Sequence, residues 1–487
     1  MKSGAGTQTI TNVNIAQTGG TIVNAGTLVV QGGATDSANI TVNGGTMKLS
    51  GAAAIGAYSG TNVSIASGAT FQLDGPDADN GTSGGTAQGN AEFGNASSSG
   101  SPLVISGSGT WLVTASSTSN VIELGNNSGN SLKINMSQGG LINVASGTLR
   151  SGGYSSPDWT SNRASLNVAT GAVFELWDGN RPVTVDSLTG GGVIGNALGG
   201  NDVTLNVGVA NGSGTFSGGI ANNIMGSSAN TTRFTKLGTG TQVLSGTNTY
   251  SGLTTVSAGV LEFNNPYALY SNNNGNSFWN ANYFTVTNGG TLAFAVGGAG
   301  QFSTSNITTL LTGGLLTTST KGFLSNSSIG FDVAGGNFTL TNNLANSTNG
   351  LINLLAYGGN TLTLTGSNSY TGTTTIESGT TLQVGSGGTA GLVGTGTITD
   401  NGTLLLNRSD ALSVAAVTGT GALTKIGAGT TTLTGSNSYT GTTTVSAGTL
   451  NVGSSGSSNL VIGTGAGQST NLLVNGGTLK DAAGTLG

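Results

Sequence analysis

A segment that occurs twice without change most constrains what this chain can fold into. Residues 363–375 read TLTGSNSYTGTTT, and residues 432–444 read the same thirteen letters 69 positions later. A looser copy, VLSGTNTYSGLTT, occupies residues 243–255. Thirteen identical residues do not recur by chance, and internal repetition of this kind is typical of proteins built by stacking one structural unit.

Each copy continues into short alternating stretches that are separated by turns. The longer copies run over 235–263, 357–385 and 424–453. Their apolar residues alternate over four to six positions, which predicts strands with one face in a core. The Ser, Gly, Asn and Ala residues between these stretches favour turns. The middle copy lacks the leading Thr-Lys pair and carries one extra residue within Gly379-Thr380-Thr381.

A shorter signature runs through the rest of the chain, a Gly followed by a small residue and an alternating apolar triplet. Examples begin at Gly26, Gly45 and Gly68, and Thr27, Thr46 and Thr70 follow one another at spacings of 19 and 24 residues. Such irregular spacing is typical of a solenoid whose coils take roughly 20 to 25 residues and differ in loop length. The sequence therefore predicts an all-β chain, with residues 1–487 forming a single β-solenoid.

The composition agrees with this prediction. Only 6% of the residues are charged, against roughly 25% in ordinary soluble proteins. Hydrophobic residues make up 35% and the net charge is only −5, so charge repulsion does not oppose collapse as it does in disordered chains. Glycine and β-branched residues disfavour helix. At about 4.8 Å per coil, some twenty coils would give an elongated rod roughly 100 Å long.

One aromatic residue recurs at a fixed place in the repeat. Tyr370 and Tyr439 occupy the same position in the two identical segments, and Tyr250 occupies it in the looser copy. A repeated aromatic residue usually packs against the core or a turn. We therefore interpret the three tyrosines as structural positions of the repeat and not as a binding platform.

The pattern T-K-x-G-x-G, followed by L-S/T-G-x-N-x-Y-S/T-G-x-T-T-V-x-A-G-x-L, resembles a known repeat. It is similar to the autotransporter-associated β-strand repeat of passenger domains in bacterial type V secreted proteins. The resemblance is clear in 235–263 and 424–453 and good in 357–385. It implies a right-handed parallel β-helix that is exported and displayed on the cell surface or released. In that family the repeat is associated with folding and transport and not with catalysis, so a structural passenger is expected.

The two ends of the chain lack the other parts of a complete autotransporter. Residues 1–6 contain no apolar stretch of a signal peptide. No run of the sequence is long and apolar enough for a transmembrane helix. No aromatic residue follows Tyr439, so the aromatic girdles of a translocator barrel are not expected either. We interpret the chain as a fragment of a longer passenger.

Several classes of site are disfavoured by what the sequence lacks. Cysteine and histidine are absent, which removes the common nucleophile, general base and zinc ligands. No cofactor and no metal are expected. Asp74, Asp77 and Asp79 could hold a hard cation through oxygen ligands, but a solvated loop is the favoured interpretation. With only 12 basic residues and a pI near 4.6, nucleic-acid binding is not expected.

The most mixed chemistry lies between Arg150 and Asp186. Two of the four tryptophans and three of the five arginines fall there, beside several carboxylates. Aromatic residues beside carboxylates and arginine are common in sugar sites, and paired carboxylates can hydrolyse glycosides. An alternative function is therefore a carbohydrate-binding or carbohydrate-cleaving β-helix, although a decorated loop is the favoured interpretation. The candidate glycan-site residues are Tyr154, Asp158, Trp159, Glu175, Trp177, Asp178 and Arg181.

A third hypothesis is a self-assembling extracellular filament. Uncapped, nearly uncharged solenoids expose strand edges at their ends, which favours end-to-end association. Threonine rows such as 373–375 and 442–444 could also form a flat surface, but the triplets occur in only two copies. The structural passenger remains the first hypothesis, and host or surface glycans and further copies of the chain remain the candidate partners.

Overall fold

A computed structural model gives the fold and describes residues 1–11, 14–15, 19–31, 35–36, 39–51, 55, 61–75, 91–94, 102–125, 132–152, 157–177, 181–196, 201–224, 230–270, 278–316, 320–452, 472–474 and 478–481. The chain forms two compact units, Met1–Thr254 and Thr255–Gly487. In both, the paired strands run parallel to one another, so the prediction of a parallel β-helix is confirmed.

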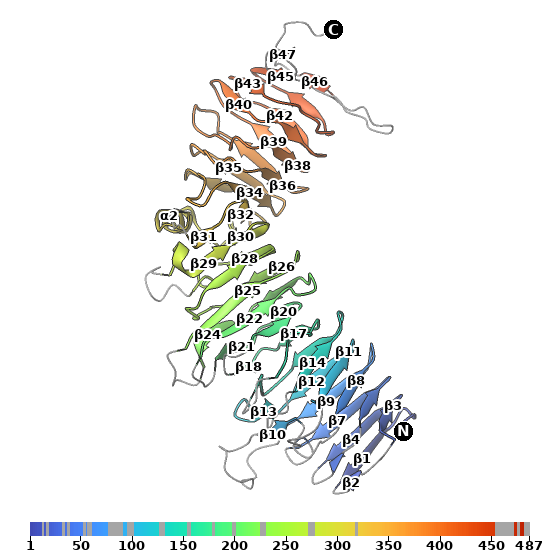
Figure 1. The fold of residues 1–487 in the computed structure, drawn as a ribbon. Coiled ribbons are helices and arrows are strands. Elements are labelled where there is room, and N and C mark those ends of the chain that lie inside the picture. Colours follow the sequence, from blue (N-terminus) through green and yellow to red (C-terminus); the bar gives the residue numbers. More distant parts are fainter. Residues whose placement is uncertain are drawn as a thin grey trace. The chain divides into compact units, whose positions relative to one another are not determined.

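The first unit is organised around one long parallel sheet (Figure 1). Each coil of the chain contributes one strand to it, and strands of successive coils lie side by side. The strands, in their order of pairing, are β1 (Thr7–Thr11), β4 (Thr27–Gln31), β7 (Thr46–Ser50), β9 (Thr70–Asp74), β12 (Thr110–Thr114), β15 (Leu141–Val144), β17 (Ser165–Val168), β20 (Leu188–Gly190), β23 (Gly214–Phe216) and β26 (Thr241–Leu244).

Shorter parallel sheets form the other faces of the first unit. One consists of β10 (Ala91–Phe93), β13 (Val121–Leu124), β16 (Thr148–Arg150), β18 (Val173–Leu176), β21 (Val193–Asn196) and β24 (Gly219–Asn223). A second consists of β3 (Thr21–Val23), β6 (Ile40–Val42), β8 (Asn62–Ile65), β11 (Val104–Gly107) and β14 (Lys133–Met136). The remaining strands are β2 (Asn14–Ile15), β5 (Thr35–Asp36), β19 (Val183–Val185), β22 (Val203–Val207) and β25 (Thr232–Lys236), and β27 (Thr254–Val256) begins at the unit's last residue.

The second unit repeats this arrangement. One sheet contains β28 (Gly259–Phe263), β30 (Gly290–Ala295), β32 (Ser327–Asp332), β34 (Ile352–Tyr357), β36 (Thr374–Ile376), β38 (Ile398–Asp400) and β41 (Val417–Thr418). Another contains β33 (Phe338–Leu340), β35 (Thr361–Leu364), β37 (Thr381–Val384), β39 (Thr403–Leu406), β42 (Ala422–Lys425), β44 (Thr443–Val445) and β46 (Leu472–Val474). The others are β29 (Phe284–Val286), β31 (Gly322–Phe323), β40 (Leu412–Val414), β43 (Thr430–Leu433), β45 (Thr449–Val452) and β47 (Thr478–Asp481).

The core of each unit is a set of apolar rows that run from coil to coil. Alternate residues of a strand point inward, so residues in register on successive strands stack on one another. In the first unit one buried row contains Leu28, Met47, Phe71, Trp111, Ile142, Leu166 and Leu188. Thr27, Thr46 and Thr70 are also in register, so the spacings of 19 and 24 residues were correctly assigned to successive coils.

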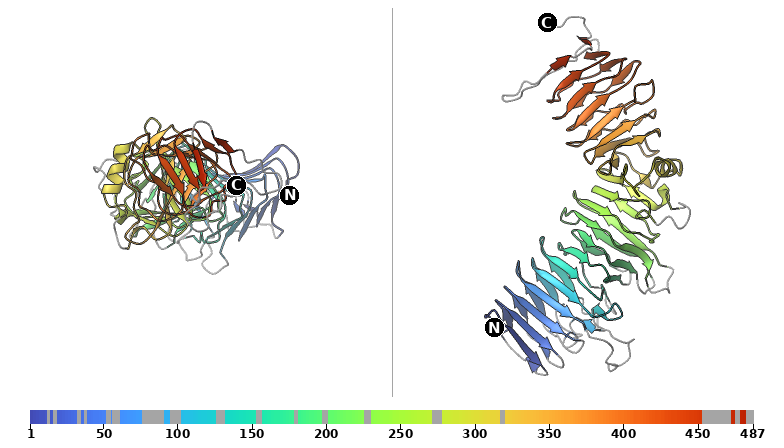
Figure 2. Two further views of the ribbon diagram at one scale, coloured as in Figure 1. Left: turned by 90° about the horizontal axis from the view of Figure 1, so that it is seen from above. Right: turned by 180° about the vertical axis from the view of Figure 1, so that it is seen from behind.

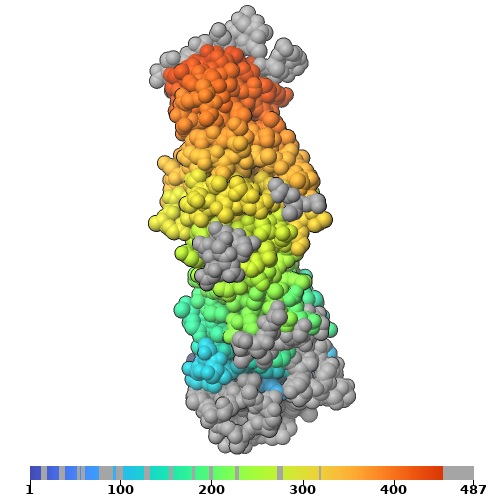
Figure 3. All heavy atoms as spheres, turned by 90° about the vertical axis from the view of Figure 1, so that its left-hand side faces the viewer, coloured from blue at the N-terminus to red at the C-terminus, as the bar shows by residue number. Residues whose placement is uncertain are grey.

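The second unit carries a helical element outside its strands. Helix α2 (Thr304–Thr312) lies at the periphery of the coils in each view of Figures 1 and 2. Ser303 begins it with a capping box, in which Ser303 and Asn306 each bond the other's backbone N–H. The short 3-10 helix η2 (Ala281–Tyr283) precedes β29. Figure 3 shows the coils of the second unit following one another in sequence order from yellow to red.

Candidate functional site

The repeated tyrosines lie inside the coils and are hydrogen-bonded there. Tyr250, Tyr370 and Tyr439 are at most 3% exposed. Each hydroxyl contacts the hydroxyl of a threonine four residues later, at 2.7, 2.7 and 2.6 Å for Thr254, Thr374 and Thr443 respectively. Burial raises the pKa of Tyr370 to about 12. In each repeat the motif's tyrosine and the threonine four positions later therefore form one buried pair, which satisfies two hydroxyl groups at once.

The asparagine two positions before each tyrosine connects the repeat to the preceding coil. Asn248, Asn368 and Asn437 are at most 3% exposed. Their side-chain oxygens accept hydrogen bonds from backbone N–H groups of the coil before, namely those of Ile220 (2.9 Å), Leu344 (2.7 Å) and Val417 (2.9 Å). A buried backbone donor without a partner would be costly, so the asparagine supplies a bond that the strand ladder does not make there.

A lysine that heads the repeat points into the core. Lys425 is fully buried at the end of β42, in a row between Leu406 of β39 and Val445 of β44. Its Nζ donates to the backbone oxygens of Gly427 and Ala447. Because the ammonium is removed from water, burial lowers the pKa of Lys425. Within the described part of the chain, none of the ion pairs includes Lys425.

The same arrangement recurs at two other lysines. Lys236 is fully buried at the end of β25, and its Nζ donates to the oxygens of Leu237 (2.5 Å) and Gly238 (2.9 Å). Burial lowers its pKa to about 8, although the nearby carboxylate of Asp186 acts in the opposite direction. Lys2 donates to the oxygens of Gly4 and Ala25. The turn after Lys2, Ser-Gly-Ala-Gly-Thr, has the Gly-x-Gly-Thr form of the turns after Lys236 and Lys425.

The segments that contain these lysines, asparagines and tyrosines match a known family. The passenger-associated-transport-repeat family matches residues 2–30, 234–263, 354–384 and 423–452. The chain carries four passenger-associated transport repeats. The resemblance drawn from the sequence is thereby confirmed, and the repeats imply an exported autotransporter passenger. No curated protein and no solved structure matches the chain.

One of the four transport repeats was missed from the sequence. The repeat at 2–30 has no tyrosine at the motif position and no copy of the Ser-Asn-Ser-Tyr segment. The signal that could have revealed it is the Lys-x-Gly-x-Gly-Thr run that starts at Lys2, together with Ala25-Gly26-Thr27-Leu28 about one coil later. In the repeat at 354–384, register places Ala356 where Lys425 stands in the last repeat.

A row of charged side chains crosses the sheet that contains β10, β13, β16 and β18. Glu92, Glu123, Arg150 and Glu175 are in register on successive strands. Nη1 of Arg150 lies 2.7 Å from Oε2 of Glu123, and its Nε lies 2.5 Å from Oε2 of Glu175. The guanidinium carbon lies 4.8 Å from the centre of the Trp177 ring, a cation–π distance. We call Glu92, Glu123, Arg150, Glu175 and Trp177 the charged row.

Arg150 is engaged on both sides within the charged row. Arg150, Glu123 and Glu175 are each at most 7% exposed. Burial raises the pKa of Glu123, and the positive charge of Arg150 opposes that shift, while Glu92 and Glu175 reinforce it. Arg150 therefore pairs with two of the three carboxylates of the row, and both ion pairs are shielded from water. Such shielded pairs are costly to break, because removal of one partner leaves a buried charge.

The structure separates the residues that the sequence grouped as a candidate glycan site. Glu175 and Trp177 belong to the charged row. Trp159 is only 1% exposed, its Nε1 donates to the oxygen of Ser151 (3.4 Å), and its ring meets Phe174 edge-on at 6.0 Å. Asp158 pairs with Lys133 of β14 at the backbone and accepts hydrogen bonds from Thr160.

Arg181 is the remaining described member of that group. Arg181 is exposed and acts electrostatically on Asp158. Tyr154 and Asp178 lie outside the described residues. The structure thus brings Glu175 and Trp177 together with Arg150, and it places the described Asp158, Trp159 and Arg181 elsewhere.

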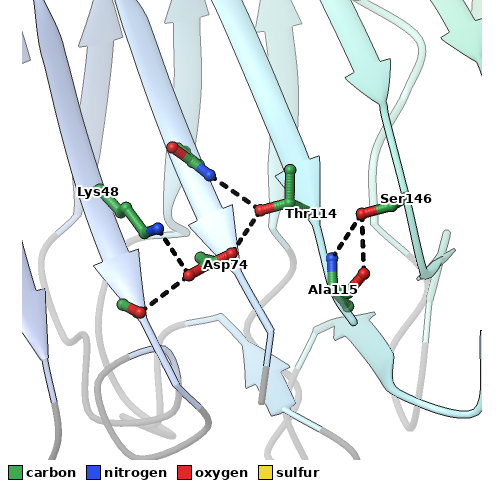
Figure 4. A network of polar contacts seen from close by, with 7 residues as sticks. Lys48, Asp74, Thr114, Ala115 and Ser146 are labelled. Carbon is green, nitrogen blue, oxygen red and sulfur yellow. Dashed lines mark hydrogen bonds and ion pairs between the residues drawn. The ribbon is translucent and has the colours of Figure 1, made fainter. Parts of the chain in front are cut away.

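The acidic loop expected near Asp74 is described only in part. Asp74 ends β9 and belongs to a polar network on the outer face of the long sheet (Figure 4). Its carboxylate lies 2.7 Å from Nζ of Lys48 and accepts hydrogen bonds from Ser50 (2.9 Å) and Thr114 (2.6 Å). Asp77 and Asp79 lie outside the described residues.

The described residues contain no candidate metal site and no candidate membrane-spanning helix. They contain no group of three or more acidic side chains placed to hold a metal ion, and the chain has no histidine or cysteine. No helix among them is long and apolar enough to cross a membrane.

A second acidic cluster, which sequence reasoning missed, lies in the second unit. Glu262 of β28, Asp332 of β32 and Tyr357 of β34 meet there, and the Tyr357 hydroxyl donates to Oε2 of Glu262 at 2.9 Å. Burial and the neighbouring carboxylate of Asp332 raise the pKa of Glu262 to about 7. The residues lie up to 95 positions apart, so no local motif could have revealed the cluster.

Proposed function

We propose that this passenger segment has a structural and not a catalytic role, as a stalk of stacked coils that holds attached domains outside the bacterial cell. The observation that carries the proposal is how the repeats use their polar side chains. In the last repeat, Lys425 and Asn437 bond to backbone groups of neighbouring coils, and Tyr439 bonds to the hydroxyl of Thr443 within its own coil. Groups that hold coils together in this way are not available to a substrate.

The stalk is tested by X-ray scattering of the purified chain and by protease treatment of intact cells. Each stacked coil adds about 4.8 Å to the length of the stalk. Small-angle X-ray scattering of the purified chain is therefore expected to show a maximum dimension on the order of 100 Å. A compact particle would contradict the stalk. Protease added to intact bacteria that produce the full-length protein is expected to remove the segment, and complete protection would contradict display outside the cell.

Glycan binding is a second candidate function, and the charged row favours it. Trp177 is only partly buried, and its ring lies over Arg150 beside Glu175. The exposed part of the indole can stack on a sugar ring, while Arg150 and Glu175, each 5% exposed, support the ring from within. Adhesion to host or surface glycans would follow from such a site.

A glycan panel distinguishes the two candidates. If the charged row binds sugars, the purified chain binds at least one glycan, and Trp177→Ala abolishes that binding. Tyr267→Ala is the matched control, because Tyr267 is a 56% exposed aromatic residue of the other unit. If the chain binds no glycan on a broad panel, the stalk stands without the second function. Sedimentation of the same sample tests end-to-end self-association.

A further inference from the structure

The transport repeats that lie within one unit close on themselves. In the repeat at 423–452, β42 pairs with β44 and β43 pairs with β45, so its first two strands stack on its last two. The repeat at 354–384 pairs β34 with β36 and β35 with β37 in the same way. In the repeat at 2–30, β1 pairs with β4, and Lys2 pairs with Val23. A repeat is therefore two stacked corners of the solenoid and the strands that flank them.

The buried lysine joins those two corners. In the last repeat the first corner is Gly427-Ala428-Gly429 and the second is Ser446-Ala447-Gly448. Nζ of Lys425 donates to Gly427 in the first corner and to Ala447, at 3.5 Å, in the second. The repeat at 2–30 is built alike, because Nζ of Lys2 donates to Gly4 in one corner and to Ala25, at 3.4 Å, in the other.

The corners can approach closely because the second one ends in glycine. Gly448 has φ +65°, and a Cβ atom there would lie 2.5 Å from the Gly427 oxygen. Gly26 has φ +68°, and its Cβ would lie 2.3 Å from the Gly4 oxygen. Only glycine fits both the positive φ and this contact. The Ala-Gly of the motif and the lysine are thus parts of one contact between corners.

The repeat that lacks the lysine carries a different side chain in the same contact. Ala356 takes the lysine's place in the repeat at 354–384, and this is the copy with one extra residue at its second corner. Thr380 in that corner is fully buried, and its Oγ1 accepts a hydrogen bond from the N–H of Gly359 in the first corner at 3.0 Å. Loss of the lysine is accompanied by a new bond between the same two corners.

We propose that the transport repeats at 2–30, 354–384 and 423–452 are self-closing folding nuclei of the solenoid, and that the corner side chain, Lys2, Thr380 or Lys425 respectively, is the latch that closes each of them. The proposal deepens the structural role proposed above and rests on it, since it states how the stalk begins to form. A nucleus needs contacts that are close in sequence, because loop closure costs entropy before any contact is gained. Lys425 and Ala447 are 22 residues apart, so the latch requires no other part of the chain.

The order of protection during refolding tests the proposal on the unaltered chain. The purified 487-residue protein is diluted from urea and pulse-labelled by hydrogen exchange, and peptides are followed by mass spectrometry. Amides of 354–384 and 423–452 are expected to become protected before those of 284–295 and 322–332, which belong to coils of the same unit outside the repeats. Simultaneous or later protection of the repeats would overturn the proposal.

Two substitutions test the latch itself. Lys425→Met keeps the apolar length of the side chain and removes its donors, and Thr380→Val keeps the shape and removes the hydroxyl. Each is expected to slow the protection of its own repeat by about fivefold or more, because a contact present in the transition state changes the folding rate. Lys321→Met is the control, since Lys321 is an exposed lysine of the same unit that donates to the oxygen of Asn282.

The kinetic readout separates a latch from an ordinary stabilising contact. If Lys425→Met and Thr380→Val leave the protection rates unchanged and only accelerate unfolding, the corner contacts form late and the proposal is wrong. Should Lys425→Met fail to fold, Thr380→Val and the unaltered chain still decide the question. These measurements do not depend on shape or glycan binding, so failure of the nucleus and failure of the stalk are recognised separately.

Discussion

The hydroxyl of Tyr357 donates a hydrogen bond to the carboxylate of Glu262, 2.9 Å away, across two intervening strands of the sheet. Register places Ala293 and Gly330 in line with Glu262 on those strands, so no large side chain stands between them. Asp332 lies on the strand next to Tyr357. Burial, together with the negative charges of Glu262 and Asp332, raises the pKa of Tyr357, which therefore stays protonated and remains a donor.

This cluster predicts that the second unit is more stable in acid than in mild base. Because the pKa of Glu262 is about 7 in the folded chain, against an ordinary value of 4.5, the folded state holds an extra proton between these limits. The stabilising contribution of Glu262 is thus complete below about pH 4.5 and is lost as the pH rises through 7. Asp400, whose pKa burial raises to about 6, acts in the same direction.

Glu262→Gln isolates the contribution of Glu262. The amide keeps the acceptor for Tyr357 and carries no charge near Asp332. The variant is expected to gain on the order of 3 kcal/mol in free energy of unfolding at pH 8 and almost nothing at pH 4.5. Native-state hydrogen exchange of peptides from 259–263 and 352–357 measures the gain in this unit. An equal effect at both pH values would show that Glu262 does not titrate between them.

The charged row predicts an asymmetry between single and combined substitutions. Arg150→Met leaves Glu123 and Glu175 buried without their counter-ion, and is expected to cost about 3 to 5 kcal/mol of stability in the first unit. The triple variant Arg150→Met, Glu123→Gln, Glu175→Gln removes the stranded charges and is expected to recover most of the loss. Hydrogen exchange of peptides from 91–176 measures both, and a triple variant no more stable than the single one would contradict the charge argument.

The sequence predicted the coil register for the coils that contain Thr27, Thr46 and Thr70. These threonines could be aligned because a glycine stands one or two residues before each of them and an alternating stretch follows, and they stack in the structure. Arg150 and Glu175 form an ion pair between successive coils. Both residues lie within the region that the sequence singled out, because they are only one coil apart. Trp159 fell there too, although its ring packs on Phe174.

The rest could not be predicted because coils differ in length. A solenoid brings together residues whose separation in sequence is a sum of several unequal coils, so Glu262 and Tyr357 cannot be paired by counting. The inward lysines were hidden for a different reason. A lysine at the end of an alternating strand reads as a solvated residue, and only the carbonyl oxygens of two stacked corners make its burial tolerable. Those oxygens belong to the backbone and leave no trace in the sequence.

The buried hydroxyl pairs predict that the repeats respond alike to one substitution. Tyr370→Phe and Tyr439→Phe each remove a hydroxyl and leave that of Thr374 or Thr443 without this contact inside the core. Each change is expected to cost about 1 to 3 kcal/mol locally, since a buried polar group is left unsatisfied. Native-state hydrogen exchange of 370–376 and 439–445 measures the loss. If the double variants Tyr370→Phe, Thr374→Val and Tyr439→Phe, Thr443→Val regain stability, the cost came from the stranded hydroxyl.

The asparagine of the motif predicts a loss that appears in the coil before it. Asn368→Ala removes the oxygen that accepts the N–H of Leu344 at 2.7 Å, and it also removes the donor to the oxygen of Leu392 at 2.6 Å. The free energy of local opening is expected to fall by about 1 to 3 kcal/mol, with faster exchange at Leu344 as its most direct sign. Asn451→Ala is the control, because Asn451 lies on the partly exposed side of β45. Equal exchange at Leu344 in the unaltered chain and in Asn368→Ala would mean that the strand end finds another acceptor, and that the motif keeps asparagine for its bond to Leu392 alone.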